Sequence, residues 1–345
     1  MSVPADVKAN TSVGADQSAN VLLAIRNLSV SFRTASSWLP VVTDVSFAIR
    51  AGETVGIVGE SGCGKSLTAL SILGLLPRHG CRATGEIIFE GRQLVGLRES
   101  ALRQIRGRRI GMIFQEPMTA LDPVFTVGEQ ISETVRTHFP ISRSEARDRA
   151  LAALESVGIP SPRHCFDQYP LWLSGGMRQR VMIAVAVVCE PRLLIADEPT
   201  TALDATVQAQ IIELLLDLSN RTGAALLFIT HNLGLVAESC SRMLTMYAGE
   251  IVEDASVDEA IARPLHPYTS GLLLSLPGLS RRKSTLPSIP GRVPAPSEMP
   301  SGCRFAPRCQ WVEPQCGKPQ GMAVADERRV RCRRHESLTL PGAMR

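Results

Sequence analysis

TVGIVGESGCGKS, residues 54–66, is the stretch of sequence that decides the fold. It opens with an apolar, β-branched run (54–58), passes through a glycine-rich loop, and enters a stretch through Leu76 that favours a helix. Glycine lets the backbone of such a loop curl around a phosphate with several N–H groups pointing inward, and the start of the next helix adds a favourable dipole. The pattern predicts a phosphate-binding loop between a strand and a helix.

Lys65 and Ser66 give this loop its expected chemistry. The lysine neutralises charge on the β- and γ-phosphates of a nucleotide, and the serine hydroxyl is a ligand for Mg²⁺. The alternative is a coincidental glycine-rich turn, which the flanking strand and helix disfavour. The residues expected to contact ATP in this segment are Gly59, Ser61, Gly62, Cys63, Gly64, Lys65, Ser66 and Leu67.

LLIADE, residues 193–198, reads as an apolar strand that ends in two carboxylates. Ligands bind at the carboxyl ends of parallel strands, so we expect Asp197 at the Mg²⁺ ion and Glu198 beside the attacking water. The alternative is a strand that runs into an ordinary acidic turn. Two adjacent acids at the end of a buried strand are costly without a partner, which favours the functional interpretation.

The order of the predicted elements indicates the fold class. Residues 21–32 and 41–50 show the alternation of antiparallel strands, and after residue 54 short apolar strands alternate with amphipathic helices. That alternation predicts an α/β protein whose mostly parallel sheet is covered by helices on both faces. Residues 1–20 read as a flexible lead, 21–255 as the nucleotide-binding domain, and 256–345 as a proline- and cysteine-containing, loop-rich extension.

LSGGMRQR, residues 173–180, resembles the signature motif of ABC ATPases, and it precedes the acidic strand as in that family. The resemblance implies the ABC-type P-loop fold, with an antiparallel β subdomain and a helical subdomain. It also implies a head-to-tail dimer, because each ATP is held between the phosphate loop of one subunit and the signature of the other. The residues expected to act in trans are Ser174, Gly175 and Gly176 at a helix start, and Asp204 of the D-loop together with Ala202 and Leu203.

Three further positions take roles from the same resemblance. Gln115 resembles the Q-loop glutamine that contacts Mg²⁺ and the attacking water, and His231 resembles the switch histidine at the γ-phosphate. Phe32 resembles the aromatic residue that stacks on adenine. A histidine after a strand is otherwise more often structural, and a strand phenylalanine is commonly part of the core. Lys65, Gln115, Glu198 and His231 form the expected catalytic set.

Features outside the ATP site resemble the dipeptide and oligopeptide importer ATPases, a group that includes nickel importers. They are Met177 in the signature, QEPMTALDPVFTVGEQI from Gln115, MYAGEIVE from Met246, HPYT from His266, and the cysteine-containing tail. This resemblance implies a motor subunit that works with a second, related ABC ATPase subunit, two transmembrane permeases and an extracytoplasmic solute-binding protein. Asn232 and Asp254 depart from the aspartate and glycine that are usual in the group.

Bulk properties limit the remaining choices. The net charge of +4 is mild and the basic stretch at 103–109 is interrupted, so we expect a solvated face and no nucleic-acid partner. The longest apolar run, residues 181–189, is far shorter than the roughly 18 residues that span a bilayer. A chain without a spanning segment is expected in the cytosol, and the resemblance to importer ATPases implies a peripheral protein on the cytoplasmic face of a bacterial inner membrane. A soluble ABC clamp and an exporter motor remain the alternative functions.

Nine cysteines are present, and four of them lie in the tail with the spacing C-x5-C-x6-C-x15-C. Members of the importer group carry a [4Fe–4S] cluster in a similar tail, and four thiolates suit either that cluster or Zn²⁺. Unligated thiols are the third possibility. The candidate ligands are Cys303, Cys309, Cys316 and Cys332, whereas the other five cysteines are scattered as small hydrophobic residues.

Overall fold

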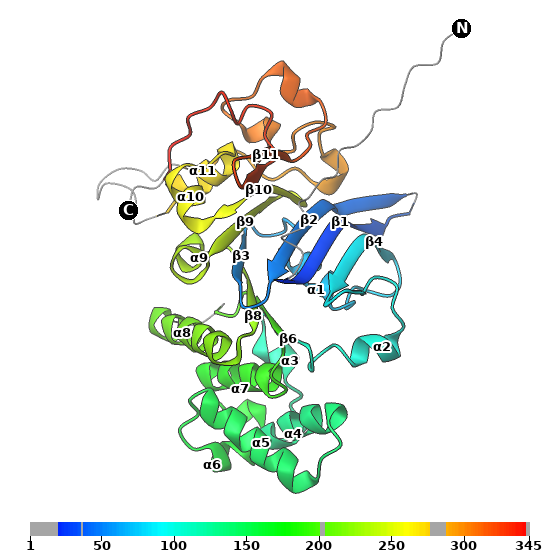
Figure 1. Cartoon of the computed structure of the whole chain (residues 1–345), viewed down its shortest axis with the longest axis vertical. Coiled ribbons are helices and arrows are strands. Elements are labelled where there is room, and N and C mark those ends of the chain that lie inside the picture. Colours follow the sequence, from blue (N-terminus) through cyan, green and yellow to red (C-terminus); the bar gives the residue numbers. More distant parts are fainter. Residues whose placement is uncertain (1–19, 36, 201–203, 277–287, 343–345) are drawn as a thin grey trace.

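A computed structural model describes residues 20–35, 37–200, 204–276 and 288–342. Figure 1 shows an elongated molecule whose sheets lie in the middle, between a helical part at one end and the C-terminal segment at the other. The predicted α/β class, with an antiparallel subdomain and a helical subdomain, is confirmed.

The main sheet is eight-stranded, in the order β11-β12-β10-β9-β3-β8-β7-β6. Its central strands β9, β3, β8, β7 and β6 are parallel and consist almost entirely of buried aliphatic residues, as expected of strands covered on both faces. This arrangement brings the carboxyl ends of the central strands to one edge. The bounds are β3 (Thr54–Val58), β6 (Ile110–Ile113), β7 (Leu193–Asp197), β8 (Ala225–Thr230), β9 (Arg242–Tyr247) and β10 (Glu250–Ser256).

A separate antiparallel sheet has the order β2-β1-β4-β5. Inward-facing residues such as Leu23, Ile25 and Val45 are fully buried and belong to the same apolar core as β3. The two-residue periodicity of the sequence therefore predicted β1 and β2 correctly, whereas β4 and β5 were not predicted. The bounds are β1 (Val21–Arg33), β2 (Trp38–Arg50), β4 (Cys81–Phe89) and β5 (Arg92–Gln93).

The helices divide between the sheet and the helical part. Thr126 and Ser142 begin α4 and α5 with reciprocal capping boxes that satisfy the first free N–H groups. The helical part shares a core with β7 and β8. The bounds are α1 (Lys65–Ile72), α2 (Glu99–Arg103), α3 (Pro117–Ala120), α4 (Val127–His138), α5 (Arg143–Ser156), α6 (Pro162–Phe166), α7 (Gly175–Val187), α8 (Ala205–Thr222) and α9 (Leu233–Ser239). Gly223 ends α8 in the left-handed conformation that glycine favours, with φ +67°.

The C-terminal segment is less separate from the main domain than its composition suggested. After α10 (Val257–Ala262) and α11 (Pro267–Leu274), the chain forms a hairpin of β11 (Ala323–Ala325) and β12 (Arg328–Val330). Strand β12 pairs with β10, so the hairpin continues the main sheet. The rest of the segment is loop-rich, as expected, and the proposed boundary at residue 255 stays a prediction.

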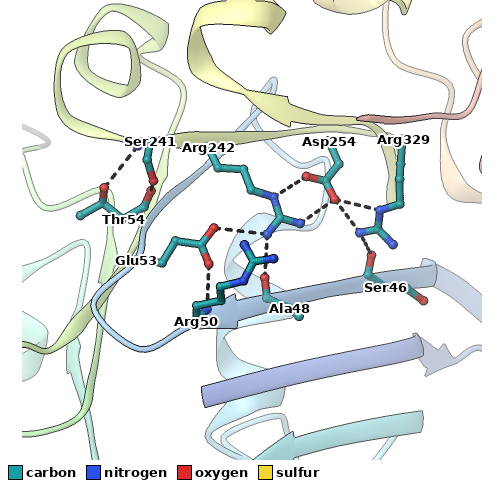
Figure 2. A network of polar contacts seen from close by, with 9 residues as sticks. All are labelled: Ser46, Ala48, Arg50, Glu53, Thr54, Ser241, Arg242, Asp254 and Arg329. Carbon is teal, nitrogen blue, oxygen red and sulfur yellow. Dashed lines mark hydrogen bonds and ion pairs between the residues drawn. The ribbon is translucent and has the colours of Figure 1, made fainter. Parts of the chain in front are cut away.

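A buried polar network fastens this hairpin to the antiparallel sheet (Figure 2). Asp254 on β10 accepts from Arg242 Nε at 2.6 Å and from Arg329 Nε at 3.0 Å. Arg242 also reaches Glu53, at 3.3 Å, and Arg329 donates to the carbonyl of Ser46, at 2.8 Å. The aspartate that departs from the group's usual glycine thus joins β9, β10 and β12 to β2 and the turn that follows it.

The HPYT segment begins helix α11. The imidazole Nδ1 of His266 accepts from the backbone N–H of Tyr268 at 3.0 Å, and Pro267 takes the first helical position, where no N–H is needed. Burial is the main reason that the pKa of His266 falls to about 3, so the ring stays a neutral acceptor. Tyr268 is thereby fixed in a fully buried position.

Candidate functional site

The phosphate loop follows β3 and depends on two of its glycines. A Cβ on Gly59 would lie 2.1 Å from the carbonyl oxygen of Met246, so only glycine allows this close approach to β9. Gly64 has φ +104° and begins α1. A Cβ there would lie 2.9 Å from side-chain carbons of Met246 and Val42. The loop is therefore shaped by contacts with both sheets.

Lys65 is folded back onto its own loop. Its ammonium donates to the carbonyl oxygens of Gly59 at 2.8 Å and Glu60 at 3.1 Å, and it is nearly fully buried. The Sγ atom of Cys63 lies 3.8 Å from the same nitrogen. Burial, as the largest effect, raises the pKa of the Cys63 thiol despite the nearby ammonium, so we expect this cysteine to be unreactive.

Ser66 and Asp197 meet across the edge of the sheet. The Ser66 hydroxyl at the start of α1 donates to Asp197 Oδ1, at the end of β7, over 3.0 Å. Burial raises the pKa of Asp197, the Ser66 hydrogen bond opposes this, and the neighbouring Glu198 adds to it. A hydroxyl and a carboxylate at this spacing are the hard oxygen donors that Mg²⁺ prefers.

Glu198 lies between the two other polar side chains predicted for the site. Gln115 Nε2, beyond β6, donates to Glu198 Oε2 at 3.2 Å, and His231 Nδ1, beyond β8, lies 3.3 Å from Glu198 Oε1. The Glu198 backbone is left-handed, with φ +46°, a strained conformation typical of functional sites. Its N–H donates to Ile229 of β8 at 2.8 Å, which fixes the turn.

The signature residues begin helix α7, as predicted. The Ser174 hydroxyl accepts from the N–H of Met177 at 3.3 Å, and Gly175 and Gly176 form the first turn. Gln179, one turn further and almost fully buried, donates to the carbonyl of Pro199 at 2.6 Å. The sequence did not identify Gln179, although its place in the signature was a usable signal.

The D-loop is described only at its last residue. Asp204 caps α8 by accepting from the N–H groups of Thr206 and Val207 at 3.1 and 3.0 Å. Ala202 and Leu203 lie outside the described residues. Within the described chain, no hydrogen bond or ion pair joins Asp204 or Ser174 to the phosphate loop of the same molecule. Their action in trans stays a prediction.

The remaining nucleotide-contact candidates lie around the loop. Phe32, near the end of β1, is partly buried and packs against the core of the antiparallel sheet. Ser61 is exposed, and Leu67 is partly buried beside the same core. Nothing here tests whether Phe32 stacks on adenine, so that role stays a prediction.

Two residues of the C-terminal segment reach the phosphate loop, and sequence reasoning missed both. Arg308 contacts the carboxylate of Glu60, and the Tyr268 hydroxyl accepts from the N–H of Glu60. These contacts join positions 248 and 208 residues apart. A local sequence pattern cannot predict contacts between residues so far apart in the chain.

The four tail cysteines surround one pocket, which His266, Trp311 and Arg334 also line. Burial raises the pKa of Cys303 to about 11, and it also raises the pKa values of Cys309 and Cys332. Among the described residues, no three His, Cys, Asp or Glu side chains are arranged to hold a single metal ion. The four cysteines thus line one pocket, while the cluster and its ligand stay a prediction.

The fold and the site define an ATP-binding cassette. A model of the ABC transporter family matches residues 42–201, and a model of the oligopeptide/dipeptide transporter C-terminal region matches residues 252–316. A probable peptide ABC transporter ATP-binding protein of Sinorhizobium fredii is 53% identical over 86% of this chain and 90% of its own. A putative peptide import ATP-binding protein of Brucella abortus is 49% identical over 90% of this chain and 94% of its own.

Solved structures agree with this class. The dimeric ATP-binding cassette MJ0796, in a post-hydrolysis state with ADP and Pi, matches with a TM-score of 0.61 at 29% identity, over 68% of this chain and 98% of its own. CbiO1 of Clostridium perfringens, part of an ABC transporter complex, matches with a TM-score of 0.60 at 27% identity, over 70% of this chain and 91% of its own.

The chain belongs to the ATP-binding proteins of ABC transporters, in the oligopeptide/dipeptide transporter family. It is an ATPase and the motor subunit of such a transporter. No helix among the described residues is long and apolar enough to cross a membrane.

Proposed function

We propose that this chain drives the import of peptides by hydrolysing ATP, with Glu198 as the group that activates the attacking water. The observation that carries the proposal is the position of the Glu198 carboxylate, 3.2 Å from Gln115 and 3.3 Å from His231, one residue beyond the Ser66–Asp197 pair. A carboxylate held by two polar side chains is suited to orient a water and to accept its proton.

The phosphate loop supplies the binding half of the reaction. Its inward N–H groups and the start of α1 cradle the phosphates, and the Lys65 ammonium adds positive charge to that cradle. Ser66 and Asp197, with Gln115, are the residues that would hold Mg²⁺, whose charge stabilises the triphosphate as the γ-phosphoryl group leaves. His231, whose side chain is 61% exposed, is free to contact the γ-phosphate.

Peptide cargo is supported by the C-terminal region and by the relatives. That region matches the oligopeptide/dipeptide model, and the relatives at about half identity are named for peptide import. The nickel importers of the same group make a non-peptide solute the competing cargo. Selectivity in such systems belongs to other subunits, so the cargo is tested on the assembled transporter.

Two motor subunits are needed for each complete site. The signature helix start at Ser174 and the cap at Asp204 have no contact with their own phosphate loop in the described chain, and the MJ0796 cassette is dimeric. We infer a head-to-tail pair in which each chain completes the other's ATP site. A related second subunit, rather than an identical copy, is the partner that the family resemblance favours.

An exposed apolar surface lies where the permeases are proposed to dock. It spans the segment around α3 and the short turn before the signature, and the N–H of Val127 holds the two together by donating to the carbonyl of Gln168 at 2.9 Å. Apolar side chains gathered at the surface are typical of protein interfaces. The residues are Met118, Val124, Phe125, Leu171 and Trp172. This surface supports a peripheral position at the cytoplasmic face of the membrane, beside the permeases.

The tail pocket fits a [4Fe–4S] cluster in its donor set. Four cysteine thiols surround a single pocket, and thiolates are the ligands such clusters take. Arg334, which lines the pocket, brings positive charge that offsets a negatively charged cluster. Anaerobic purification tests this: brown protein with about four irons per chain, bleached by dithionite, supports the cluster. Stoichiometric zinc, or metal-free colourless protein, contradicts it.

The proposed function is tested by what the motor assembles with. An epitope-tagged Glu198→Gln chain, held closed by ATP, is purified from native membranes and its partners are identified by mass spectrometry. Two permeases and a second motor support the importer, and reconstituted uptake of a labelled dipeptide over nickel supports the cargo. Purification without any membrane partner would instead indicate a soluble ABC clamp.

A further inference from the structure

Glu60 puts a negative charge into the loop that is to bind a triphosphate. It is the second residue of the loop, its carbonyl accepts from Lys65 at 3.1 Å, and its side chain is about one-third exposed. A carboxylate so close to bound phosphates repels them unless another group compensates it. The loop itself supplies no such group, because Lys65 contacts the backbone of Glu60 and not its carboxylate.

Arg308 provides that compensation from the C-terminal segment. Its Nη1 and Nη2 atoms donate to the two carboxylate oxygens of Glu60, at 2.7 and 3.0 Å, in the parallel arrangement that makes arginine–carboxylate pairs strong. The guanidinium side chain is only 5% exposed. Its Nε donates to the carbonyl of Pro290 at 2.8 Å, so the group is held in place from its other side.

Tyr268 holds the backbone at the same residue. Its hydroxyl oxygen accepts from the N–H of Glu60 at 2.9 Å, and its ring is fully buried against Tyr247 and Phe305. Two residues of the C-terminal segment therefore bind Glu60: Arg308 donates to its side chain, and Tyr268 accepts from its main chain. Preorganising the loop in this way lowers the cost of ordering it around ATP.

We infer that Arg308 is a positioning residue of the ATP site, which neutralises Glu60 and, with Tyr268, fixes the first turn of the phosphate loop. The inference rests on the assignment of residues 59–66 as the ATP site. It makes the C-terminal segment a working part of that site, beyond any role of its cysteines. Arg308 does not touch the reacting atoms and acts through Glu60.

If charge compensation is the role of Arg308, two single variants and their double variant should differ in their affinity for ATP. Arg308→Gln leaves Glu60 uncompensated and weakens binding about tenfold, whereas Glu60→Gln leaves the positive charge of Arg308 uncompensated near the phosphates and tightens binding by about threefold. The double variant has no net change in charge at this position. It is expected to bind within about threefold of the wild type, so the second substitution rescues the first.

The test is equilibrium binding of a fluorescent ATP analogue with Mg²⁺ to the full-length chain, with thermal unfolding recorded for each variant. A double variant as weak as Arg308→Gln contradicts the inference, because a purely structural role of Arg308 is not rescued at Glu60. If Arg308→Gln does not fold, Glu60→Gln decides alone, and weaker binding than the wild type contradicts the charge account. A wild type that does not bind the analogue contradicts instead the assignment of the ATP site.

Discussion

At the scale of single residues, the site depends on what surrounds Glu198. The left-handed backbone at this position turns the carboxylate away from the strand direction, and its N–H is held by Ile229. Asp197, one residue earlier, contacts Ser66 instead. Two neighbouring acids thus have separate partners, which allows one to ligate metal while the other handles water.

His231→Ala is expected to lower kcat about a hundredfold while leaving the KM for ATP nearly unchanged. The reason is that His231 Nδ1 lies 3.3 Å from Glu198, the proposed catalytic carboxylate, while no hydrogen bond or ion pair in the described part of the chain joins His231 to the phosphate loop. Steady-state ATPase assays over a range of ATP concentrations measure both constants. The matched control is His164→Ala, at an exposed position on α6, with wild-type constants expected. A raised KM with normal kcat would contradict the catalytic role.

The sequence was most informative for residues whose roles follow from a short motif and the strand or helix beside it. Lys65 and Ser66 begin α1, and Asp197 and Glu198 lie at the end of β7, where the structure pairs Ser66 with Asp197 as expected. Partners such as Arg308 and Glu60 could not be predicted, because their pairing depends on how a distant loop folds back over the site. Asn232 was noticed in the sequence as a departure from the group's aspartate, but its role was not predicted. Its side chain caps α9 by accepting from the N–H of Leu235, which an aspartate could also do.

At the scale of elements, the central strands are well predicted and the tail is not. Strands β3, β6, β7 and β8 carry short apolar runs, whose burial on both faces leaves few alternatives, whereas β9, which contains Arg242 and Thr245, was not predicted. Strands β11 and β12 have three residues each and include Arg328 and Arg329. Their sequence shows no alternation, and they are stabilised as strands by long-range contacts such as the pairing of β12 with β10 and the ion pair of Arg329 with Asp254.

Asp254→Asn is expected to destabilise the protein by about 3 kcal/mol, since it leaves two partly buried guanidinium groups without their shared carboxylate. Urea unfolding at neutral pH measures this loss. Asp217→Asn is the matched control, because Asp217 forms an exposed pair with Arg221 on α8 and should change stability by less than about 0.5 kcal/mol. Equal effects of the two substitutions would contradict a structural role for the network in Figure 2.

The same aspartate predicts a pH dependence. Burial by itself raises the pKa of Asp254, but the hydrogen bonds and charges of Arg242 and Arg329 outweigh it, and the folded pKa lies below the usual value. Its stabilisation is therefore complete above the unfolded pKa of about 4 and is lost as the pH falls through the lower folded value. Unfolding measured between about pH 5 and pH 3 should show a smaller acid loss in Asp254→Asn than in the wild type.

At the scale of the whole molecule, the chain has one phosphate loop and one signature, and no hydrogen bond between described residues joins Ser174 to the phosphate loop. Figure 1 shows the helical part, with α7, extending away from the C-terminal segment. Ser174→Asp is expected to abolish ATP-driven pairing of motor subunits, because it keeps a good helix cap but sets a negative charge against the partner's γ-phosphate.

Ser174→Asn is the control that separates the effect of the added negative charge from any effect on the cap of α7. Asparagine caps a helix about as well as serine and adds no charge, so pairing with ATP should be retained. Light scattering after size-exclusion chromatography, with and without ATP, measures the mass of the motor with its partner subunit. Normal pairing of Ser174→Asp would contradict the assignment of this helix start to the partner's ATP site.

The central claim is that Glu198 activates the water that attacks ATP, and Glu198→Gln tests it most directly. The measurement is single-turnover hydrolysis of γ-labelled ATP by the assembled motor pair, together with the amount of ATP that stays bound. Glutamine keeps the shape of the side chain but removes its charge, so hydrolysis should fall by about a thousandfold while bound ATP accumulates in a closed pair. Hydrolysis at the wild-type rate would contradict the account.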